Sequence, residues 1–420
     1  MIFPSHYRPG VPLHYVGVVR IDIVTKEFPP TIYGGAGVHV AELSRVLASR
    51  VDLRVHAFGP DREPTYEGAR VTGHGVPGGL ETANPAVQTL GTDLQILQEL
   101  AGTDLIHTHT WYANMAGHWG GLLHGVPHIL SAHSLEPLRP WKAEQLGGGY
   151  RISSWAEATA YDSAAAVIAV SAGMRQDILT AYPDVDPEKV QVVHNGIDTT
   201  LWTPATESSD AQILRGHGID PDRPTVAFVG RITRQKGVPY LLRAAAELDR
   251  DVQLVLCVGA PDTPELAAEV SDLIAGLQAN RDGVVVIEGM LPRRDVMAVL
   301  SQATVFACPS IYEPLGIVNL EAMACGTAVV ASATGGIPEV VQHGQTGLLV
   351  QLDQVADGTG TPVDETAFVQ DFAAALTSVL TDPERAAQMG RAGRQRAIDH
   401  FSWDSIADRT LEVYRSVLES

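Results

Sequence analysis

The chain has 420 residues, too many for one ordinary hydrophobic core, so two domains are expected. Its 29 basic and 49 acidic residues give a formal net charge of −20, which disfavours nucleic acid and anionic membranes as partners. No apolar run reaches the length of a transmembrane helix. An anionic substrate would therefore need a local basic pocket inside an acidic protein.

The cysteines and the N-terminus indicate where the protein resides. Cys257, Cys308 and Cys325 lie in apolar segments and lack metal-type spacing, which is typical of core thiols in a reduced compartment. Residues 1–17 contain three prolines but no apolar segment of the kind a signal peptide needs. We therefore expect a disordered leader over residues 1–17 and a cytoplasmic protein.

The first half of the chain alternates apolar runs with segments of helical periodicity, which predicts a parallel α/β domain. The predicted strands are 18–24, 51–58, 104–107, 127–131, 166–170 and 190–193. One predicted helix begins near residue 37, and three others cover 113–123, 153–164 and 173–181.

A second α/β series follows a turn-rich stretch at 195–204, so we place the domain boundary between residues 203 and 204. The predicted strands are 225–229, 254–258, 284–287, 305–308 and 328–331, and the predicted helices are 367–380, 383–400 and 404–418. The last helix has an apolar stripe that must pack against another surface. The expected architecture is two doubly wound Rossmann-like domains, 18–203 and 204–403, with a central cleft.

Two carboxylates flank the start of a predicted helix in the second half. After the strand at 305–308, a loop places Glu313 at its mouth, and a helix beginning near Gly316 or Ile317 carries Glu321 about one turn inside. The free N–H groups of the helix N-terminus between them form an anion site. Carboxylates in an apolar stretch need partners, which favours a ligand-binding role over a structural one. A polyol–phosphate–polyol ligand, such as a sugar nucleotide, fits this layout.

Two other loops suggest phosphate binding. Arg231 and Lys236 follow the first strand of the second half, where such sheets bind ligands, and two cations can neutralise a diphosphate without a metal. A solvated basic loop is the alternative. The glycine loop of Gly34, Gly35 and Gly37 permits close approach of a ligand, with a plain tight turn equally open.

Further candidates follow strands of the first half. His133, Glu136, Arg139 and Lys142 come after the strand at 127–131, where they could bind sugar or anion or act in catalysis. A core histidine, a loop salt bridge between Glu136 and Arg139, and ordinary surface are the competing interpretations.

The strand at 104–107 leads into a second group of polar and aromatic residues. Trp111 and Tyr112 could stack on a sugar or pack in the core. We expect the imidazoles of His107 and His109 to lie on opposite faces, and with no third ligand evident we predict no metal site.

The pair Arg231/Lys236 and the Glu-x7-Glu pattern of Glu313 and Glu321 resemble the retaining glycosyltransferases of family 4 (GT4), which have the GT-B fold. The resemblance extends over nearly the whole chain from Val18. Residues 27–40, 109–114 and 132–142 are similar to the actinobacterial glycogen synthase group, the α-maltose-1-phosphate synthases. One departure is Tyr33, which precedes Gly34 and Gly35 where plant-type and enterobacterial synthases carry a Lys-x-Gly-Gly loop. In this fold the final helix crosses back onto the first domain.

The resemblance implies a role for each candidate on the donor side. Glu313 would hold donor-sugar hydroxyls and Glu321 the ribose, while His133 would contact the sugar near its 6-hydroxyl. Arg231 and Lys236 would neutralise the diphosphate, and the glycine loop of Gly34, Gly35 and Gly37 would cover the sugar-phosphate. The backbone of Leu315, Gly316 and Ile317, at the start of the helix, would bind the phosphates. Met290 and Leu291 would meet the adenine. Glu313, His133, Arg231 and Lys236 are the expected catalytic residues.

The resemblance implies an acceptor-binding site in the first domain. Arg139 and Lys142 would bind the acceptor phosphate, and Trp111, Tyr112 and Glu136 are the other acceptor-binding candidates. The resemblance implies retaining transfer of glucose from ADP-glucose to α-glucose 1-phosphate, with an α-1,4 bond and no cofactor or metal. Elongation of glycogen, a sugar-nucleotide epimerase and a non-enzymatic sugar-nucleotide sensor stay open as alternatives. A homodimer is compatible with this expectation.

Overall fold

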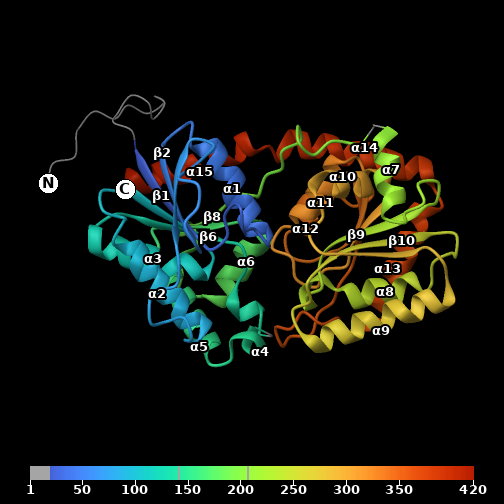
Figure 1. The fold of residues 1–420 in the computed structure, drawn as a ribbon, viewed down its shortest axis with the longest axis horizontal. Helices are drawn as coiled ribbons and strands as arrows, with labels where there is room; N and C mark the ends of the chain where they lie inside the picture. The colour runs from blue at the N-terminus through green and yellow to red at the C-terminus, as the bar shows by residue number, and fades with distance from the viewer. Residues whose placement is uncertain (1–18, 141, 206–207) are drawn as a thin grey trace. The chain divides into compact units, whose positions relative to one another are not determined.

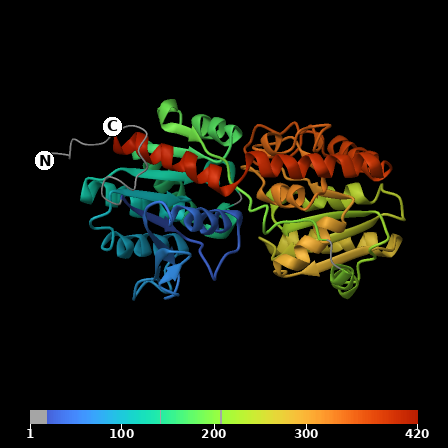
Figure 2. The same ribbon diagram turned by 90° about the horizontal axis from the view of Figure 1, so that it is seen from above.

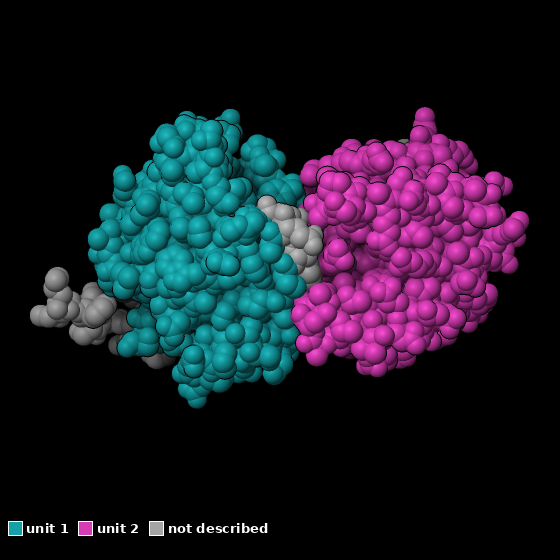
Figure 3. Space-filling model, turned by 90° about the horizontal axis from the view of Figure 1, so that it is seen from below, with its two compact units in different colours: residues 1–195, 403–420 teal, residues 196–402 magenta. Residues whose placement is uncertain are grey.

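The computed structural model describes residues 19–140, 142–205 and 208–420. The chain divides into two compact units (Figure 3): Met1–Asn195 with Trp403–Ser420 form unit 1, and Gly196–Ser402 form unit 2. None of the helices in the described ranges is long and apolar enough to cross a membrane. The predicted leader lies outside the described residues.

Unit 1 is built on an eight-stranded sheet of order β3-β4-β2-β1-β5-β6-β7-β8, in which every pair is parallel except β3 with β4. The strands are β1 Arg20–Thr25, β2 Asp52–Phe58, β3 Thr65–Tyr66, β4 Ala69–His74, β5 Leu105–His109, β6 His128–Ala132, β7 Ala166–Ala169 and β8 Val190–Val192. The helices are α1 Gly35–Leu47, α2 Pro85–Leu97, α3 Trp111–His124, α4 Lys142–Leu146, α5 Gly149–Ser163, α6 Ala172–Ala181 and α15 Trp403–Leu418.

Unit 2 is built on a six-stranded parallel sheet of order β11-β10-β9-β12-β13-β14. The strands are β9 Thr225–Arg231, β10 Gln253–Gly259, β11 Val284–Glu288, β12 Val305–Cys308, β13 Ala328–Ser332 and β14 Gly347–Val350. The helices are α7 Ser208–Gly216, α8 Val238–Ala245, α9 Pro264–Asn280, α10 Arg293–Gln302, α11 Ile317–Ala324, α12 Ile337–Val340, α13 Glu365–Leu380 and α14 Pro383–His400. Figure 1 shows α10, α11 and α14 on one face of this sheet and α8, α9 and α13 on the other.

The C-terminal helix α15 completes the core of unit 1, as the family resemblance implied. Its buried face, which includes Trp403, Ile406 and Leu411, joins the apolar cluster formed by β1, β2 and α1. Arg50 adds ion pairs to Asp404 at 2.7 Å and to Asp408 at 2.5 Å. Figure 2 shows this red helix lying along the elements of unit 1.

The division between the units falls earlier than the predicted boundary at 203/204, because the turn-rich segment belongs to unit 2. Ile197 N donates to Phe401 O at 2.7 Å, and Ala205 N donates to Ser301 Oγ at 2.9 Å. Arg394 also donates to the carbonyl of Trp202 at 3.2 Å. These bonds hold residues 197–205 against the second sheet and its helices.

Candidate active site

Both sheets reverse their strand order at an interior position, and such switch points are where open α/β sheets bind ligands. In unit 2 the reversal lies between β9 and β12. The loop after β9 carries Arg231 and Lys236, and the loop after β12 carries Glu313. The topology therefore brings these three residues to one end of the sheet, as the sequence predicted.

Lys236 and Glu313 form a shielded ion pair at this switch point. Lys236 Nζ donates to Glu313 Oε2 at 2.6 Å, and Ser310 Oγ donates to the same oxygen at 3.1 Å. The side chains of Lys236 and Glu313 are 21% and 8% exposed. Burial disfavours the ammonium, but the Glu313 carboxylate outweighs that effect and raises the pKa of Lys236. Lys236 therefore stays cationic at neutral pH.

Glycines hold the backbone on both sides of this pair. Gly237 has φ 63°, and a Cβ there would lie 2.0 Å from the carbonyl oxygen of Pro309. Gly335 has φ 52°, and its Cβ would lie 2.0 Å from the carbonyl oxygen of Glu313, which also accepts from Gly336 N at 3.0 Å. Only glycine accommodates both the left-handed conformation and the close approach.

Glu321 lies one turn inside α11, which begins at Ile317 directly after the left-handed Gly316. The first N–H groups of a helix have no partner within it, so the backbone from Leu315 to Ile317 presents an anion site between the two carboxylates. Burial raises the pKa of Glu321 to about 7, against the opposing charges of Arg293 and Lys236. At neutral pH this half-buried carboxyl can therefore both accept and donate hydrogen bonds to a diol. Arg293 was not predicted, because it opens α10 in a polar surface stretch.

The other predicted donor-side residues of unit 2 follow β9 and β11. Arg231 forms an ion pair with Asp262 at 3.0 Å. The Arg231 side chain is still partly exposed at the switch point. Met290 is 81% exposed and Leu291 is half-buried, both just beyond the edge strand β11. An exposed methionine at the carboxyl end of a strand is available to a flat apolar ligand.

In unit 1 the glycine loop precedes α1 next to the switch point between β1 and β5. The amide of Gly34 donates to Glu27 Oε2 at 2.7 Å, and the amide of Tyr33 donates to it at 3.0 Å. A Cβ on Gly37 would lie 2.7 Å from that of Glu27. The helix N-terminus thus binds an anion, but that anion is the protein's own Glu27, which sequence reasoning missed. Gly35, exposed at the first position of α1, is the loop glycine nearest to solvent.

Three histidines from α1, β5 and the loop after β6 pack together in unit 1. His109 Nδ1 lies 3.0 Å from His133 Nε2, and the ring centroids of His39 and His133 are 4.7 Å apart. Burial lowers the pKa of His133 to about 4 and holds those of His39 and His109 well below the usual range. All three are neutral at neutral pH.

The expectation that His107 and His109 lie on opposite faces was wrong. Residues two apart in a strand share a face, and their ring centroids are 4.2 Å apart. Among the described residues, His39, His109 and His133 have the spacing of a potential metal ligand set. The expectation of no metal therefore stays a prediction.

Trp111 and Tyr112 differ in burial. Trp111 is 3% exposed and belongs to an apolar cluster with Met115 and Ala156, so its predicted role in stacking on a sugar is wrong. Tyr112 is half-buried, and Lys26 Nζ lies 3.6 Å from its ring centroid. Burial lowers the pKa of Lys26 to about 8, so it remains largely cationic at neutral pH. Lys26 was not predicted, since a single lysine after a strand is indistinguishable from ordinary surface.

Glu136 is buried, which contradicts its predicted place at the acceptor site. Its side chain is 1% exposed, and Ser153 Oγ donates to Glu136 Oε2 at 2.6 Å. The amide of Glu136 also donates to Glu157 Oε1 at 2.8 Å. This carboxylate therefore anchors the loop after β6 to helix α5.

The basic residues of the same loop are more accessible. Arg139 is half-buried and donates to Ser134 Oγ at 2.9 Å, and among the described residues it forms no ion pair with Glu136. Lys142 is half-buried at the start of α4. Trp141, which stands between these two basic residues in the sequence, lies outside the described residues. Arg139 and Lys142 thus remain candidates for binding an anion.

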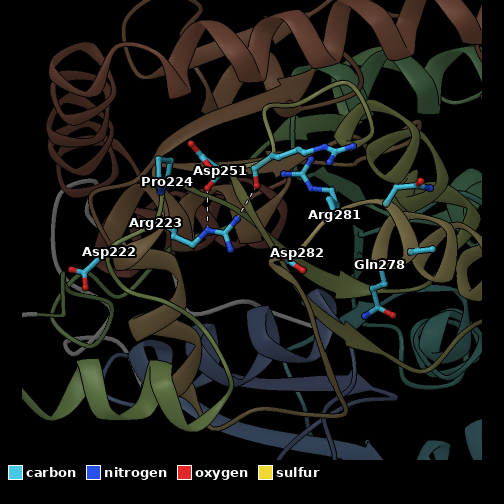
Figure 4. A pocket seen from close by; sticks show the side chains of 10 residues that line it. Asp222, Arg223, Pro224, Asp251, Gln278, Arg281 and Asp282 are labelled. Carbon is cyan, nitrogen blue, oxygen red and sulfur yellow. Dashed lines mark hydrogen bonds between the residues drawn. The ribbon is translucent and has the colours of Figure 1, made fainter.

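A hollow in unit 2 lies away from these residues (Figure 4). It is lined by residues that precede β9, β10 and β11, at the amino-terminal edge of the sheet, including Arg223, Asp251 and Arg281. Arg223 donates to the carbonyl of Asp251 at 3.1 Å, and Arg281 donates to that of Asp249 at 2.7 Å. Both guanidinium groups therefore serve the fold, and the hollow is not a candidate active site.

Comparison with known proteins identifies the chemistry of the site. Residues 33–201 match the model described as Glycosyltransferase Family 4, and residues 209–396 match that of Glycosyl transferases group 1. The chain is also 54% identical to an α-maltose-1-phosphate synthase of Mycolicibacterium smegmatis over 399 residues, which is 95% of this chain and 100% of that protein. The chain belongs to the family 4 glycosyltransferases.

Solved structures place this glycosyltransferase in the GT-B fold. Sucrose-phosphate synthase of Thermosynechococcus elongatus superposes with a TM-score of 0.77 at 24% identity, covering 96% of this chain and 99% of the other. HepE of Anabaena, solved in complex with UDP-glucose, gives a TM-score of 0.73 at 21% identity over 94% and 99%. The predictions of family and fold are therefore confirmed.

Proposed function

We propose that this glycosyltransferase moves glucose, with retention, from ADP-glucose to α-glucose 1-phosphate and releases maltose 1-phosphate. The observation that carries the proposal is the 54% identity to an α-maltose-1-phosphate synthase over the full length of that relative. The HepE complex with UDP-glucose supports a sugar nucleotide as donor, because its chain has the same fold.

The donor would bind at the switch point of unit 2. Glu313 would accept hydrogen bonds from glucose hydroxyls, and Glu321 would bind the ribose diol. The N–H groups near Leu315 and Ile317 would bind the phosphates between them. Met290 and Leu291 would cover the adenine.

Bond cleavage leaves negative charge on the departing diphosphate. Lys236 and Arg231 are preorganised cations at the end of β9, and such groups stabilise charge that develops in the transition state. They supply what a divalent cation supplies in other phosphoryl sites, so we propose that no metal is needed. Turnover should be unchanged after dialysis against EDTA, and recovery of a lost activity by Mg²⁺ or Mn²⁺ would contradict this.

The acceptor would be deprotonated by the leaving diphosphate during front-face attack. We assign no enzymatic nucleophile, because the carboxylates of unit 2 are placed as ligand-binding groups. In unit 1, His133 would contact the glucose near its 6-hydroxyl, with Gly35 and the rest of the glycine loop over the sugar-phosphate. Arg139 and Lys142 would bind the acceptor phosphate, and the cation of Lys26 on Tyr112 is a further candidate for it.

The test is a product assay with purified protein, ADP-glucose and α-glucose 1-phosphate. We expect release of ADP with one equivalent of maltose 1-phosphate, identified by NMR, and no release after the substitution Lys236→Ala. UDP-glucose and GDP-glucose in parallel measure the base preference of the donor.

The other outcomes identify the competing functions. ADP release only in the presence of glycogen would show chain elongation and sink the acceptor assignment. Interconversion of the donor without ADP release would indicate an epimerase. A sensor would bind the donor without any turnover.

A cytoplasmic location is part of the proposal, supported by three buried free thiols. The homodimer stays a prediction, and light scattering on the same preparation measures it.

A further inference from the structure

The histidine cluster of unit 1 contains a hydrogen bond that can fix the tautomer of the proposed sugar-binding histidine. His133 is neutral at neutral pH, because burial lowers its pKa to about 4. A neutral imidazole carries its proton on one nitrogen only, and the partner of the other nitrogen decides which. For His133 that partner is His109, whose Nδ1 lies 3.0 Å from His133 Nε2.

The direction of this hydrogen bond follows from the far side of the His109 ring. His109 is fully buried, and its Nε2 has no hydrogen-bond partner among the described residues. If His109 accepted at Nδ1, its proton would sit on Nε2 as an unpaired buried N–H. If His109 donates from Nδ1, the unpaired atom is only a lone pair. An orphaned buried N–H is the rarer and costlier defect, so His109 is the donor.

The neighbouring histidine holds the His109 ring in place. His107 Nδ1 lies 2.7 Å from the hydroxyl of Tyr414 on α15, and its Nε2 lies 2.8 Å from Ser131 Oγ. The buried Tyr414 hydroxyl needs an acceptor, and among the described residues His107 Nδ1 is the acceptor within reach. Tyr414 thus donates to His107, whose ring packs 4.2 Å from that of His109. On the other side of the hydrogen bond, the ring of His39 packs against that of His133, with the ring centroids 4.7 Å apart.

We propose that His109 is a positioning residue that fixes His133 as the Nδ1–H tautomer, so that His133 presents a hydrogen-bond donor to an oxygen of the bound sugar. The hydrogen bond to His109 engages Nε2 of His133, and it leaves Nδ1 on the other side of the ring to face a ligand. The identity of that ligand rests on the proposed function, whereas the tautomer does not.

The direct test is NMR of the full chain with ¹⁵N-labelled histidine, assigning the His133 ring by its loss in His133→Gln. The shifts and two-bond couplings of the ring nitrogens distinguish the two neutral tautomers. We expect the Nδ1–H form in the wild-type protein. Observation of the Nε2–H form there would overturn the proposal without any variant.

Matched variants test whether His109 is the cause. His109→Asn keeps an amide donor near the Nδ1 position and should keep the Nδ1–H form, while His109→Leu removes the donor and should give a mixture. His56→Asn disrupts a separate buried pair, in which His56 Nδ1 and His74 Nε2 are 3.1 Å apart, and should leave His133 unchanged. An unchanged tautomer in a folded His109→Leu protein would refute the role of His109.

Kinetics provide the second readout. With the wrong tautomer populated, kcat should fall on the order of 10- to 100-fold in His109→Leu with little change in the donor KM, and His109→Asn should recover most of it. If the tautomer behaves as expected but no glucose transfer occurs in any variant, the proposed function fails and the tautomer assignment stands. If transfer occurs but the tautomer is Nε2–H, this inference fails alone.

Discussion

Glu313 is the residue on which the donor site depends most, since one of its oxygens accepts from both Lys236 and Ser310. We expect Glu313→Gln to lower kcat/KM on the order of 100-fold, because an amide presents one acceptor and loses the charge that holds Lys236. Glu321→Gln should cost about tenfold or less, since a carboxyl with a pKa near 7 already binds a diol partly in its neutral form.

The measurement is steady-state glucose transfer with both variants and with a surface control, Glu384→Gln, on the exposed face of α14. The reverse order, with Glu321→Gln the more damaging, would contradict the assignment of Glu313 to the reacting sugar.

The raised pKa of Glu321 has a consequence for stability. The folded protein holds this proton between pH 4.5 and about 7, where the unfolded chain has lost it. The contribution of Glu321 to the free energy of unfolding therefore falls as pH rises through that window. Glu321→Gln removes the dependence, so the variant should gain on the order of 2 kcal/mol over wild type between pH 4.5 and pH 8.

Calorimetric melting midpoints of both proteins across this pH range test the prediction. The two should coincide near pH 4.5, which serves as the internal control. A constant difference at all pH values would mean that Glu321 titrates normally in the folded chain.

The histidine cluster of unit 1 and the contact of Glu27 with the glycine loop could not be found from the sequence. His39, His109 and His133 come from three elements, and only the parallel order β1-β5-β6 places them in contact. Glu27 accepts a hydrogen bond from the amide of Gly34, and a glycine-rich pattern does not indicate which side chain its amides bind. Glu313 and Lys236 were predictable because each follows a short apolar strand directly, and the topology of such folds brings those strands together.

The loop between β12 and α11 depends on a glycine from a different element. In Gly335→Ala, the new methyl group would displace the backbone of Glu313 in addition to straining a left-handed residue. We expect a loss of stability on the order of 2–3 kcal/mol and a fall in turnover, because Glu313 moves relative to Lys236.

Gly344→Ala is the matched control for this loop. Gly344 has φ 78°, so it carries similar backbone strain, but a Cβ there meets nothing within 4 Å. We compare the melting temperature and kcat of the two variants. Gly344→Ala measures the effect of backbone strain alone, whereas Gly335→Ala adds the displacement of the Glu313 backbone. Equal losses of turnover in both would show that the contact with Glu313 does not matter.

Some elements were predicted to within a residue and others were missed. The strand β12, Val305–Cys308, is a continuous apolar run ended by a proline, so its bounds match the prediction. The strand β4, Ala69–His74, was missed because its inward positions are Ala69, Val71 and Gly73, which give only one large apolar side chain. The helix α2, Pro85–Leu97, was missed because it buries Thr89, Gly91 and Asp93 where large apolar side chains would mark a core face.

At the scale of the whole molecule, unit 1 depends on the last helix of the chain. A chain ending at Ser402 loses the apolar face of α15, including Trp403, Ile406 and Tyr414, from its core. We expect the unfolding transition of unit 1 to be lost or strongly lowered in temperature, while that of unit 2 persists.

Calorimetry of this truncated chain is compared with one ending at Leu418, which lacks only two exposed residues and should melt like the full chain. An unchanged unit 1 transition in the shorter protein would contradict the role of α15.

The return of α15 to unit 1 also sets the order in which the chain can mature on the ribosome. Unit 2 is an uninterrupted segment, Gly196–Ser402, whereas the core of unit 1 is missing a helix until Trp403–Leu418 has been synthesised. At typical elongation rates the first sheet waits roughly 10 to 40 s for its final helix. The segment translated second is therefore the first that can finish folding, and the nascent first unit, with an apolar face uncovered, is the part of this protein with the longest exposure to chaperones.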